Sequence, residues 1–362
     1  MKDGTHGTHE NVNNGPWLLS AKNIKNNKIV ISSDDRKISE SDYKKIYKNY
    51  KLEKGDLLLT IVGTIGRAAI VKNPNNIAFQ RSVAILKTKA TYDVEFIFQL
   101  FQTKYFKNLL LRKQVVSAQP GLYLGDIRKI KISITNIIEE QRKIGTFFRK
   151  IDRQIELEEQ KLELLQQQKK GYMQKIFSQE LRFKDENGND YPEWEETTIK
   201  EIAQINTGKK DTKDAITNGS YDFYVRSPIV YKINTFSYEG EAILTVGDGV
   251  GVGKVFHYVN GKFDYHQRVY KISDFKNYYG LLLFYYFSQN FLKETKKYSA
   301  KTSVDSVRKD MIANMKVPRP IYIEQKKIGQ FIKRVDNKTK IQKQVIELLK
   351  QRKKALLQKM FI

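Results

Sequence analysis

The stretch that decides the fold begins Glu140-Gln141-Arg142-Lys143-Ile144-Gly145, and it occurs again as Glu324-Gln325-Lys326-Lys327-Ile328-Gly329. At this offset of 184 residues, with no gap, 17 of the 38 positions from Glu140 to Phe177 are identical in Glu324 to Phe361. Two unrelated surface helices are the weaker interpretation, because helix propensity alone does not produce gapless identity. The chain is therefore expected to contain one structural plan twice.

Both copies carry the seven-residue pattern of a coiled coil, with polar interruptions at matching places that are expected to set the register. The expected seam consists of Ile144, Phe148, Ile151, Ile155, Leu162, Leu165, Ile328, Ile332, Val335, Ile346, Leu349 and Leu356. A second apolar stripe flanks the seam: Phe147, Leu157, Leu164, Phe331, Ile341 and Leu348. Pairing with a single helix would leave this stripe exposed to solvent, so we infer that further helices pack on it.

The composition favours a partner with many negative charges. The chain has 65 Lys and Arg against 40 Asp and Glu, a net charge of +25, which favours nucleic acid over a membrane surface or an acidic protein. The absence of cysteine excludes disulfides and thiolate metal sites and fits a reducing cytosol. The start of the chain has no signal-peptide pattern, and no apolar run is long enough to span a bilayer. We therefore expect a cytoplasmic protein with no membrane partner.

The repeat predicts an α+β chain in which two mixed α/β domains are separated by two long helices that form a coiled coil. The expected segments are a domain at 1–135, a helix at 136–180, a domain at 181–320 and a helix at 321–362. Gln267-Arg268 echoes Gln80-Arg81, each at the start of a strand. The first domain has no counterpart of Trp194–Ile205, so either its start is truncated or it lacks an edge strand.

Local patterns predict several elements inside these domains. Apolar runs bounded by turn signals predict strands, and a run rich in Phe and Leu predicts a mostly buried helix. The expected elements are strands at 57–62, 68–71, 79–86 and 199–205, a helix at 94–111, and a short turn with a closing strand at 124–134.

The glycine-rich stretch Gly247–Lys254 resembles a phosphate loop without satisfying the motif. Asp248 and Val255 occupy the slots that the motif reserves for Gly and for Ser or Thr. Strand-like residues follow, where a dinucleotide site needs a helix. A hairpin that lets backbone approach a ligand is the better interpretation, and Gly63–Gly66 lies at the matching place in the first domain.

The sequence contains no recognisable catalytic or metal-binding set. His6 and His9 are close together, but no cysteine or second pair of histidines completes a metal site. They are either loop residues that face DNA or solvated residues on a loose terminus. Two Glu-x-Lys triplets of the kind that some nucleases use fall on predicted helices, and no nucleophile elbow is present. We expect a non-catalytic chain that binds no metal and no cofactor itself.

Polar residues at the predicted loops suit DNA better than they suit catalysis. Gln and Arg pair bidentately with adenine and guanine edges, and lysines suit phosphates, although a solvated surface charge is an equally good interpretation of each lysine. The candidate DNA-binding residues are His6, His9, Thr64, Gln80, Arg81, Lys209, Lys210, Lys213, Arg226, Lys254, His266, Gln267, Arg268, Lys296, Lys297 and Lys301.

Over nearly its whole length the chain resembles the specificity (S) subunit of a type I restriction–modification enzyme. The resemblance rests on the order of four motifs: the paired Glu-Gln-(Arg/Lys)-Lys-Ile-Gly helix openings, the Leu-Leu…Gln-Lys-(Ile/Met)-Phe helix ends, the entry Tyr191-Pro192-Glu193-Trp194-Glu195, and Gly55-Asp56-Leu57-Leu58-Leu59-Thr60 followed by Gly63-Thr64-Ile65-Gly66. It implies that each domain is a target-recognition domain for one half of a split DNA sequence. The opening strand that this family usually has in its first recognition domain is expected to be absent.

The resemblance also implies the partners and their cofactors. The two helices would pair as an antiparallel coiled coil that serves as a spacer and docks two methyltransferase (M) subunits through the flanking stripe. Restriction (R) subunits would join the complex. S-adenosylmethionine would then belong to the M subunits, and ATP with Mg to the R subunits. Two alternatives remain: a non-catalytic coiled-coil adaptor that binds acidic protein, and a stand-alone nuclease, against which the missing catalytic set argues.

The helix length predicts a separation between the two half-sites. Ile144 to Ile176 corresponds to about 48 Å of helix, or about 14 base pairs of duplex. Because the two domains differ in sequence, we expect an asymmetric bipartite target with an unread gap.

Overall fold

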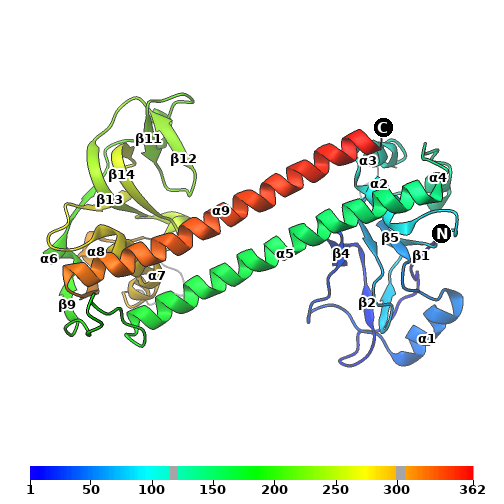
Figure 1. Ribbon diagram of the computed structural model, residues 1–362, viewed down its shortest axis with the longest axis horizontal. Helices are drawn as coiled ribbons and strands as arrows, with labels where there is room; N and C mark the ends of the chain where they lie inside the picture. The colour runs from blue at the N-terminus through cyan, green and yellow to red at the C-terminus, as the bar shows by residue number, and fades with distance from the viewer. Residues whose placement is uncertain (115–120, 299–305, 362) are drawn as a thin grey trace. The chain divides into compact units, whose positions relative to one another are not determined.

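The computed structural model describes residues 1–114, 121–298 and 306–361. It divides into two compact units, Met1–Lys161 with Gln342–Ile362, and Leu162–Ile341. Two long helices supply one end to each unit (Figure 1). These are α5 (Ile138–Phe177) and α9 (Tyr322–Met360). Each half of a long helix is therefore part of a unit, whereas the sequence suggested helical segments separate from the globular ones.

The first unit contains a four-stranded antiparallel sheet in the order β1-β8-β5-β6. The strands are β1 (Lys2–Asp3), β5 (Leu57–Thr60), β6 (Ala68–Ile70) and β8 (Val83–Leu86). β5 is apolar at three successive positions because both faces are covered. Leu57 and Leu59 pack into a cluster with Phe98, while Leu58 packs on the opposite side with Phe79.

The other strands and helices of the first unit surround this sheet (Figure 1). β2 (Trp17–Leu19) pairs in parallel with β7 (Ile77–Phe79). β3 (Ile24–Lys25) and β4 (Lys28–Ile29) form a hairpin after the short helix η1 (Ala21–Asn23). The helices are α1 (Glu40–Asn49), α2 (Val94–Gln102), α3 (Lys104–Arg112) and α4 (Leu124–Arg128).

Three expected elements of the first unit differ in the structure. The helix expected at 94–111 is broken at Thr103, whose hydroxyl accepts from Phe106 N at 3.1 Å and caps α3. The strand expected at 79–86 is interrupted by a turn in which Val83 N donates to Gln80 O. At 124–134, α4 forms in place of the turn, and the closing strand is absent from the described structure there.

The second unit contains a six-stranded sheet in the order β10-β15-β13-β14-β11-β12, antiparallel except between β11 and β14. The strands are β10 (Gln204–Thr207), β11 (Tyr221–Tyr224), β12 (Val230–Ile233), β13 (Tyr238–Val246), β14 (Phe256–Tyr265) and β15 (Val269–Ser273). The apolar face of α7 (Gly280–Lys296) packs against this sheet, with Phe287 and Phe291 against Phe256.

A separate two-stranded antiparallel sheet pairs β9 (Glu195–Thr198) with β16 (Lys316–Arg319), which lie before and after the six-stranded sheet in the chain. The remaining helices are α6 (Ile199–Ile202), α8 (Lys309–Ala313) and the short η2 (Thr212–Asp214) and η3 (Gly249–Gly251). The single strand expected at 199–205 is wrong. A capping box of Thr198 and Glu201 starts α6 inside that range, so strands lie on either side of a helical turn.

The two units share one backbone framework. Ile61 N donates to Ser82 O in the first unit, as Gly247 N donates to Arg268 O in the second. Three further pairs of backbone hydrogen bonds match in the same way: Val83 to Gln80 with Val269 to His266, Gln80 to Leu19 with His266 to Tyr224, and Leu122 to Ile61 with Val307 to Gly247. Arg81 therefore corresponds to Gln267, and Ser82 to Arg268. The correspondence that the sequence suggested, Gln80-Arg81 with Gln267-Arg268, was therefore wrong by one residue.

The edge strand that we expected to be missing from the first unit is present. β1 pairs antiparallel with β8, as β10 pairs with β15. Gly4 and Gly208 follow these strands at places where an added Cβ would lie within 2.7 Å of backbone carbonyl oxygen. The β9–β16 strand pair and α6 have no counterpart in the described part of the first unit.

The glutamine of the repeated motif joins each long helix to its unit. Gln141 is fully buried; its side chain accepts from Asp93 N at 2.9 Å and donates to Thr135 O at 2.8 Å. Gln325 repeats the arrangement with Tyr279 N and Pro320 O, both at 2.7 Å. In each unit the glutamine side chain thus accepts from a backbone N–H at the start of α2 or α7 and donates to a backbone carbonyl just before the long helix. Both backbone groups are thereby hydrogen-bonded.

Contacts inside each unit show α5 and α9 running antiparallel to each other. In the first unit Lys353 Nζ lies 2.6 Å from Asp152, and the Gln342 side-chain amide donates to Glu158 at 2.6 Å. In the second unit Lys169 Nζ lies 2.5 Å from Asp336. The two lysine–aspartate pairs occupy equivalent positions of the repeat. Each aspartate also accepts a hydrogen bond from its unit's helix, Gln99 on α2 or Tyr285 on α7, at 2.8 Å.

All residues of the expected seam are buried or half-buried. Phe148, Ile155, Ile328, Ile332 and Ile346 are buried, and the other expected members are half-buried: Ile144, Ile151, Leu162, Leu165, Val335, Leu349 and Leu356. Towards the helix ends the buried face moves by one residue. Met173 and Leu357 are buried there, next to Tyr172 and Leu356.

Candidate nucleic-acid interface

Four loops of the second unit meet at one end of its sheet. Lys210 forms a parallel bridge with His266, and Gln267 N donates to Lys210 O at 2.8 Å, which joins the loop after β10 to the β14–β15 turn. Gly247 N donates to Arg268 O at 2.8 Å and joins the glycine-rich loop to the same turn. An added Cβ on Gly251 would lie 3.0 Å from Arg226 O, so the loop after β11 touches the glycine-rich loop.

Two aspartates bind the polar side chains of this surface. Asp248 lies 3.3 Å from Arg226 and 3.7 Å from Arg268. Asp211 accepts from the Gln267 side chain at 3.1 Å. The pKa of Asp211 is lowered, foremost because the backbone N–H of Lys213 donates to it, with help from nearby His266 and Gln267. These ion pairs and hydrogen bonds hold the long side chains of the surface in place.

The expected DNA contacts of the second unit do not all reach solvent. Lys209, Lys213, Arg226, Lys254, Gln267, Arg268 and Lys296 are exposed, and Lys210 is half-buried. His266 is only 2% exposed, and burial lowers its pKa; its Nδ1 accepts from Arg268 N at 2.9 Å. The structure therefore assigns His266 to supporting the turn, which corrects its expected place among the DNA contacts.

Two lysines near the end of α7 complete the set for this unit. Lys297 is exposed and lies 2.6 Å from Glu294, which raises the pKa of the lysine. Lys301 lies outside the described residues.

The first unit presents the equivalent loops with different side chains. Thr5 bridges to Gln80, and Arg81 N donates to Thr5 O at 3.0 Å, as Gln267 N donates to Lys210 O. Arg81 and Thr64 are exposed, and Gln80 is half-buried. Thr64 occupies the tip of a tight connection in which Gly63 and Gly66 have positive φ angles.

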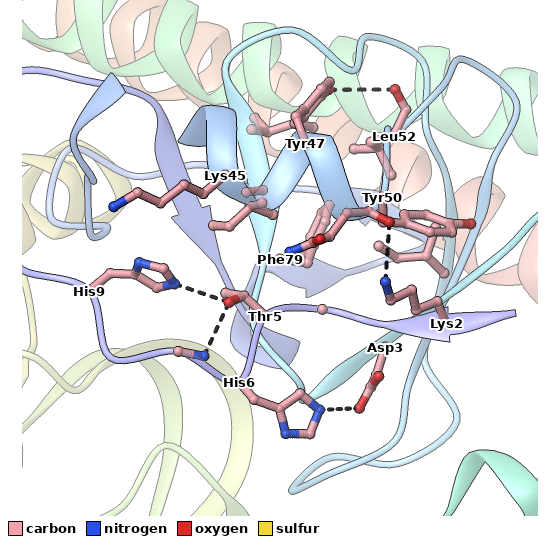
Figure 2. A pocket seen from close by; sticks show the side chains of 17 residues that line it. Lys2, Asp3, Thr5, His6, His9, Lys45, Tyr47, Tyr50, Leu52 and Phe79 are labelled. Atoms are coloured by element: carbon pink, nitrogen blue, oxygen red, sulfur yellow. Dashed lines mark hydrogen bonds and ion pairs between the residues drawn. The ribbon is translucent and has the colours of Figure 1, made fainter. Parts of the chain in front are cut away.

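A cavity of about 410 Å³ lies beside these loops in the first unit. Figure 2 shows side chains that line it, among them His9 and Thr5. His9 Nε2 lies 3.0 Å from the Thr5 hydroxyl. His9 Nδ1 lies 3.3 Å from Asp42, whose pKa is lowered foremost by this histidine. His9 is therefore buried, whereas His6 is exposed and lies 2.5 Å from Asp3. The two histidines have different partners, and no group of three or more His, Asp or Glu suited to a metal occurs in the described ranges.

A family model for the type I restriction modification DNA specificity domain matches residues 10–167 and 191–351. The chain belongs to this family. Its two matched regions cover most of the chain and carry the repeated framework in each unit.

Characterised relatives of this specificity-domain chain are similar over part of their length. One is the type I restriction enzyme EcoDI specificity subunit of Escherichia coli, 25% identical over 169 residues, 46% of this chain and 37% of the relative. Another is the type I restriction enzyme MjaIX specificity subunit of Methanocaldococcus jannaschii, 28% identical over 203 residues, 53% of this chain and 46% of the relative. The chain thus spans less than half the length of the curated relatives it matches.

Two solved structures share the fold of this specificity-domain chain. The type I restriction–modification S subunit from M. genitalium superposes with a TM-score of 0.65 at 15% identity, covering 100% of this chain and 99% of the other. A chain from a study of complex assembly and conformational transition of the type I R-M system superposes with a TM-score of 0.56 at 15% identity, covering 99% and 95%. Of the helices described, none is long and apolar enough to cross a membrane.

The glycine-rich loop of this specificity-domain chain is not built as a phosphate loop. It forms the short helix η3 and returns into β14 without opening a longer helix, which agrees with the hairpin interpretation. Sequence reasoning missed the two aspartates, Asp211 and Asp248. Asp211 lies among lysines and Asp248 among glycines, and neither position is informative until the loop that it contacts is known.

Proposed function

We propose that this chain is the specificity subunit of a type I restriction–modification enzyme, and that its two units read the two halves of an asymmetric, split DNA target. The observation that carries the proposal is the repeated loop framework, which presents different side chains at equivalent positions. Arg81 stands where Gln267 stands in the second unit. Arginine suits guanine and glutamine suits adenine in the major groove, so the two half-sites differ.

Basic residues around each reading position would supply most of the affinity. Lys209, Lys213 and Lys254 are exposed beside Gln267 and suit phosphate oxygens. Contacts of this kind bind every sequence equally and weaken with salt, whereas base contacts discriminate. The lysines therefore hold the second unit on the duplex while its loops test the sequence.

The two long helices form, in this proposal, the spacer between the half-sites and the docking surface for two M subunits. The antiparallel contacts of Asp152 with Lys353 and of Asp336 with Lys169 support a continuous coiled coil. Phe331 of the proposed docking stripe instead packs on Tyr172 and Phe183 at ring-centroid distances of 5.2 and 5.5 Å. The other members of the stripe are exposed and available to partner helices: Phe147, Leu157, Leu164, Ile341 and Leu348.

Bond chemistry belongs to the partners in this proposal. The M subunits extrude a base and methylate it from S-adenosylmethionine, and the R subunits use ATP and Mg. The present chain holds the duplex in register and contributes no catalytic residue.

Methylome sequencing of a host that expresses this chain with its M partner tests the proposal. A methylated motif of two unequal halves around a fixed gap supports it. Absence of any motif, together with salt-dependent binding to acidic protein and none to duplex DNA, would instead establish the coiled-coil adaptor. Expression of the M partner alone is the matched control, because a motif that persists without this chain is not read by it.

A further inference from the structure

Val250 is the most exposed large apolar side chain described in the chain, at 94%. It stands at the tip of η3 in the glycine-rich loop, between Gly249 and Gly251. A single exposed apolar residue is ordinary on a protein surface and by itself indicates nothing. Its surroundings decide whether it has a function.

The loop that carries Val250 is held by bonds on both sides of the tip. Val252 N donates to Gly249 O at 3.1 Å, and Val255 N donates to Gly251 O at 3.0 Å. Before the tip, Asp248 pairs with Arg226 and Arg268. Because the backbone of Gly251 also touches that of Arg226, the tip stands on a network that includes the β14–β15 turn. Val250 therefore projects from a defined position.

Cations and a base-reading side chain lie on the loops that are bonded to this tip. Arg226, Arg268 and Lys254 are exposed on the same group of loops, and Gln267 lies in the turn bonded to them. A polyanion is the partner that this charge favours. For an apolar side chain beside these cations, the major groove of DNA offers one apolar group to contact, the C5-methyl of thymine.

We propose that Val250 contacts the methyl group of a thymine in the major groove of the half-site read by the second unit. The contact makes Val250 a specificity-determining residue and requires an A·T pair there. Insertion between base steps is less favoured, because valine is not among the side chains that usually act as wedges. The inference rests on the proposed function and extends it to one base pair.

Replacement of thymine by deoxyuridine, which lacks only the methyl group, tests the contact. Once the motif is known, each thymine of that half-site is replaced in turn, and binding of the complex of this chain with its M subunits is measured. The wild-type complex should lose affinity about fourfold at one position, the factor expected from burying one methyl group. Val250→Ser should bind thymine and uridine duplexes equally, and Val250→Thr should keep part of the difference.

A matched control is Ile323→Ser, which removes a similarly exposed apolar side chain, 61% exposed, from α9. It should leave the thymine preference intact. The inference is wrong if the half-site has no thymine, if no uridine substitution matters, or if Val250→Ser keeps the preference. It is also wrong if 2-aminopurine fluorescence reports base unstacking that Val250→Ser abolishes. Failure of the complex to bind any specific site would overturn the proposed function itself, whereas specific binding with no effect at residue 250 overturns only this inference.

Discussion

Arg81 and Gln267 hold the same backbone position and differ in what they can bind. The N–H of each donates to a carbonyl of the loop that follows the edge strand, Thr5 in the first unit and Lys210 in the second. The side chain is therefore free to face a partner while the backbone is fixed. Gln267 is further oriented by Asp211, which accepts its amide hydrogen at 3.1 Å.

Gln267→Arg is expected to change the base preferred in the second half-site from adenine to guanine. A bidentate contact contributes about 1–3 kcal/mol of discrimination, so the change should alter the methylated motif at one position. Methylome sequencing measures it. Gln330→Arg adds the same charge at an exposed position of α9 and should leave the motif unchanged. An unaltered motif in Gln267→Arg would remove this residue from the reading position.

Glu156 on α5 contributes to the stability of the first unit, and this contribution depends on pH. Hydrogen bonds from Lys28 and Arg153 lower the pKa of Glu156 from 4.5 to about 2. A depressed carboxyl pKa contributes stability that is present above pH 4.5 and is lost as pH falls through about 2. The contribution is modest because Lys28 and Arg153 are exposed.

Glu156→Gln is therefore expected to lower the free energy of unfolding at pH 6 and to flatten its decline below pH 4.5. Denaturant unfolding across this pH range provides the measurement. Glu139→Gln, at an exposed position of the same helix, is the control and should leave the acid slope as in the wild type. Parallel acid slopes for Glu156→Gln and the wild type would contradict the assignment.

The long helices contain glycines with opposite structural roles. An added Cβ on Gly145 would lie 2.6 Å from the Asp93 carboxylate and 2.8 Å from Phe96 N, so this glycine allows α5 to approach the start of α2. Gly329 does the same for α9 and α7. Gly171 lies inside α5 with nothing within 4 Å of an added Cβ. A helical glycine without a neighbour has only its conformational cost.

These surroundings predict that replacing glycine by alanine at two positions of α5 changes the stability of the chain in opposite directions. Gly171→Ala should stabilise the chain by about 0.8–1 kcal/mol, the propensity difference between the two residues. Gly145→Ala should destabilise it, because the contact with the α2 backbone cannot relax without separating the helices. Thermal unfolding of both variants gives the comparison. A stabilised Gly145→Ala would show that the close approach is not required.

At the scale of the whole molecule, the proposed spacer predicts a length relation. Deletion of one heptad from facing positions of both long helices shortens the rod by about 10 Å, or about 3 base pairs of duplex. The unread gap of the methylated motif should shorten accordingly, or activity should be lost. Deletion from one helix alone disrupts the pairing and is the control for misfolding. An active complex with an unchanged gap would exclude the proposal that the two helices set the length of the unread gap.

The repeated stretch determined by itself that two helices occur, where they lie and which face is apolar, because heptad spacing and gapless identity are local properties of the chain. The same pattern indicated polar positions in the seam. The glutamine and glycine of the motif were visible as repeats, but their function was not, because their partners, Asp93 and Tyr279, lie more than 40 residues away.

Only the tertiary structure decided which residues share a position in the two units. Gln80-Arg81 and Gln267-Arg268 have the same residue types. The backbone hydrogen bonds to Thr5 and Lys210 nevertheless align Arg81 with Gln267. It also buried His266 and His9 and exposed Val250. The physical reason is that side-chain exposure and register depend on which distant backbone groups pair, and such pairing leaves no mark in the spacing of residues along the chain.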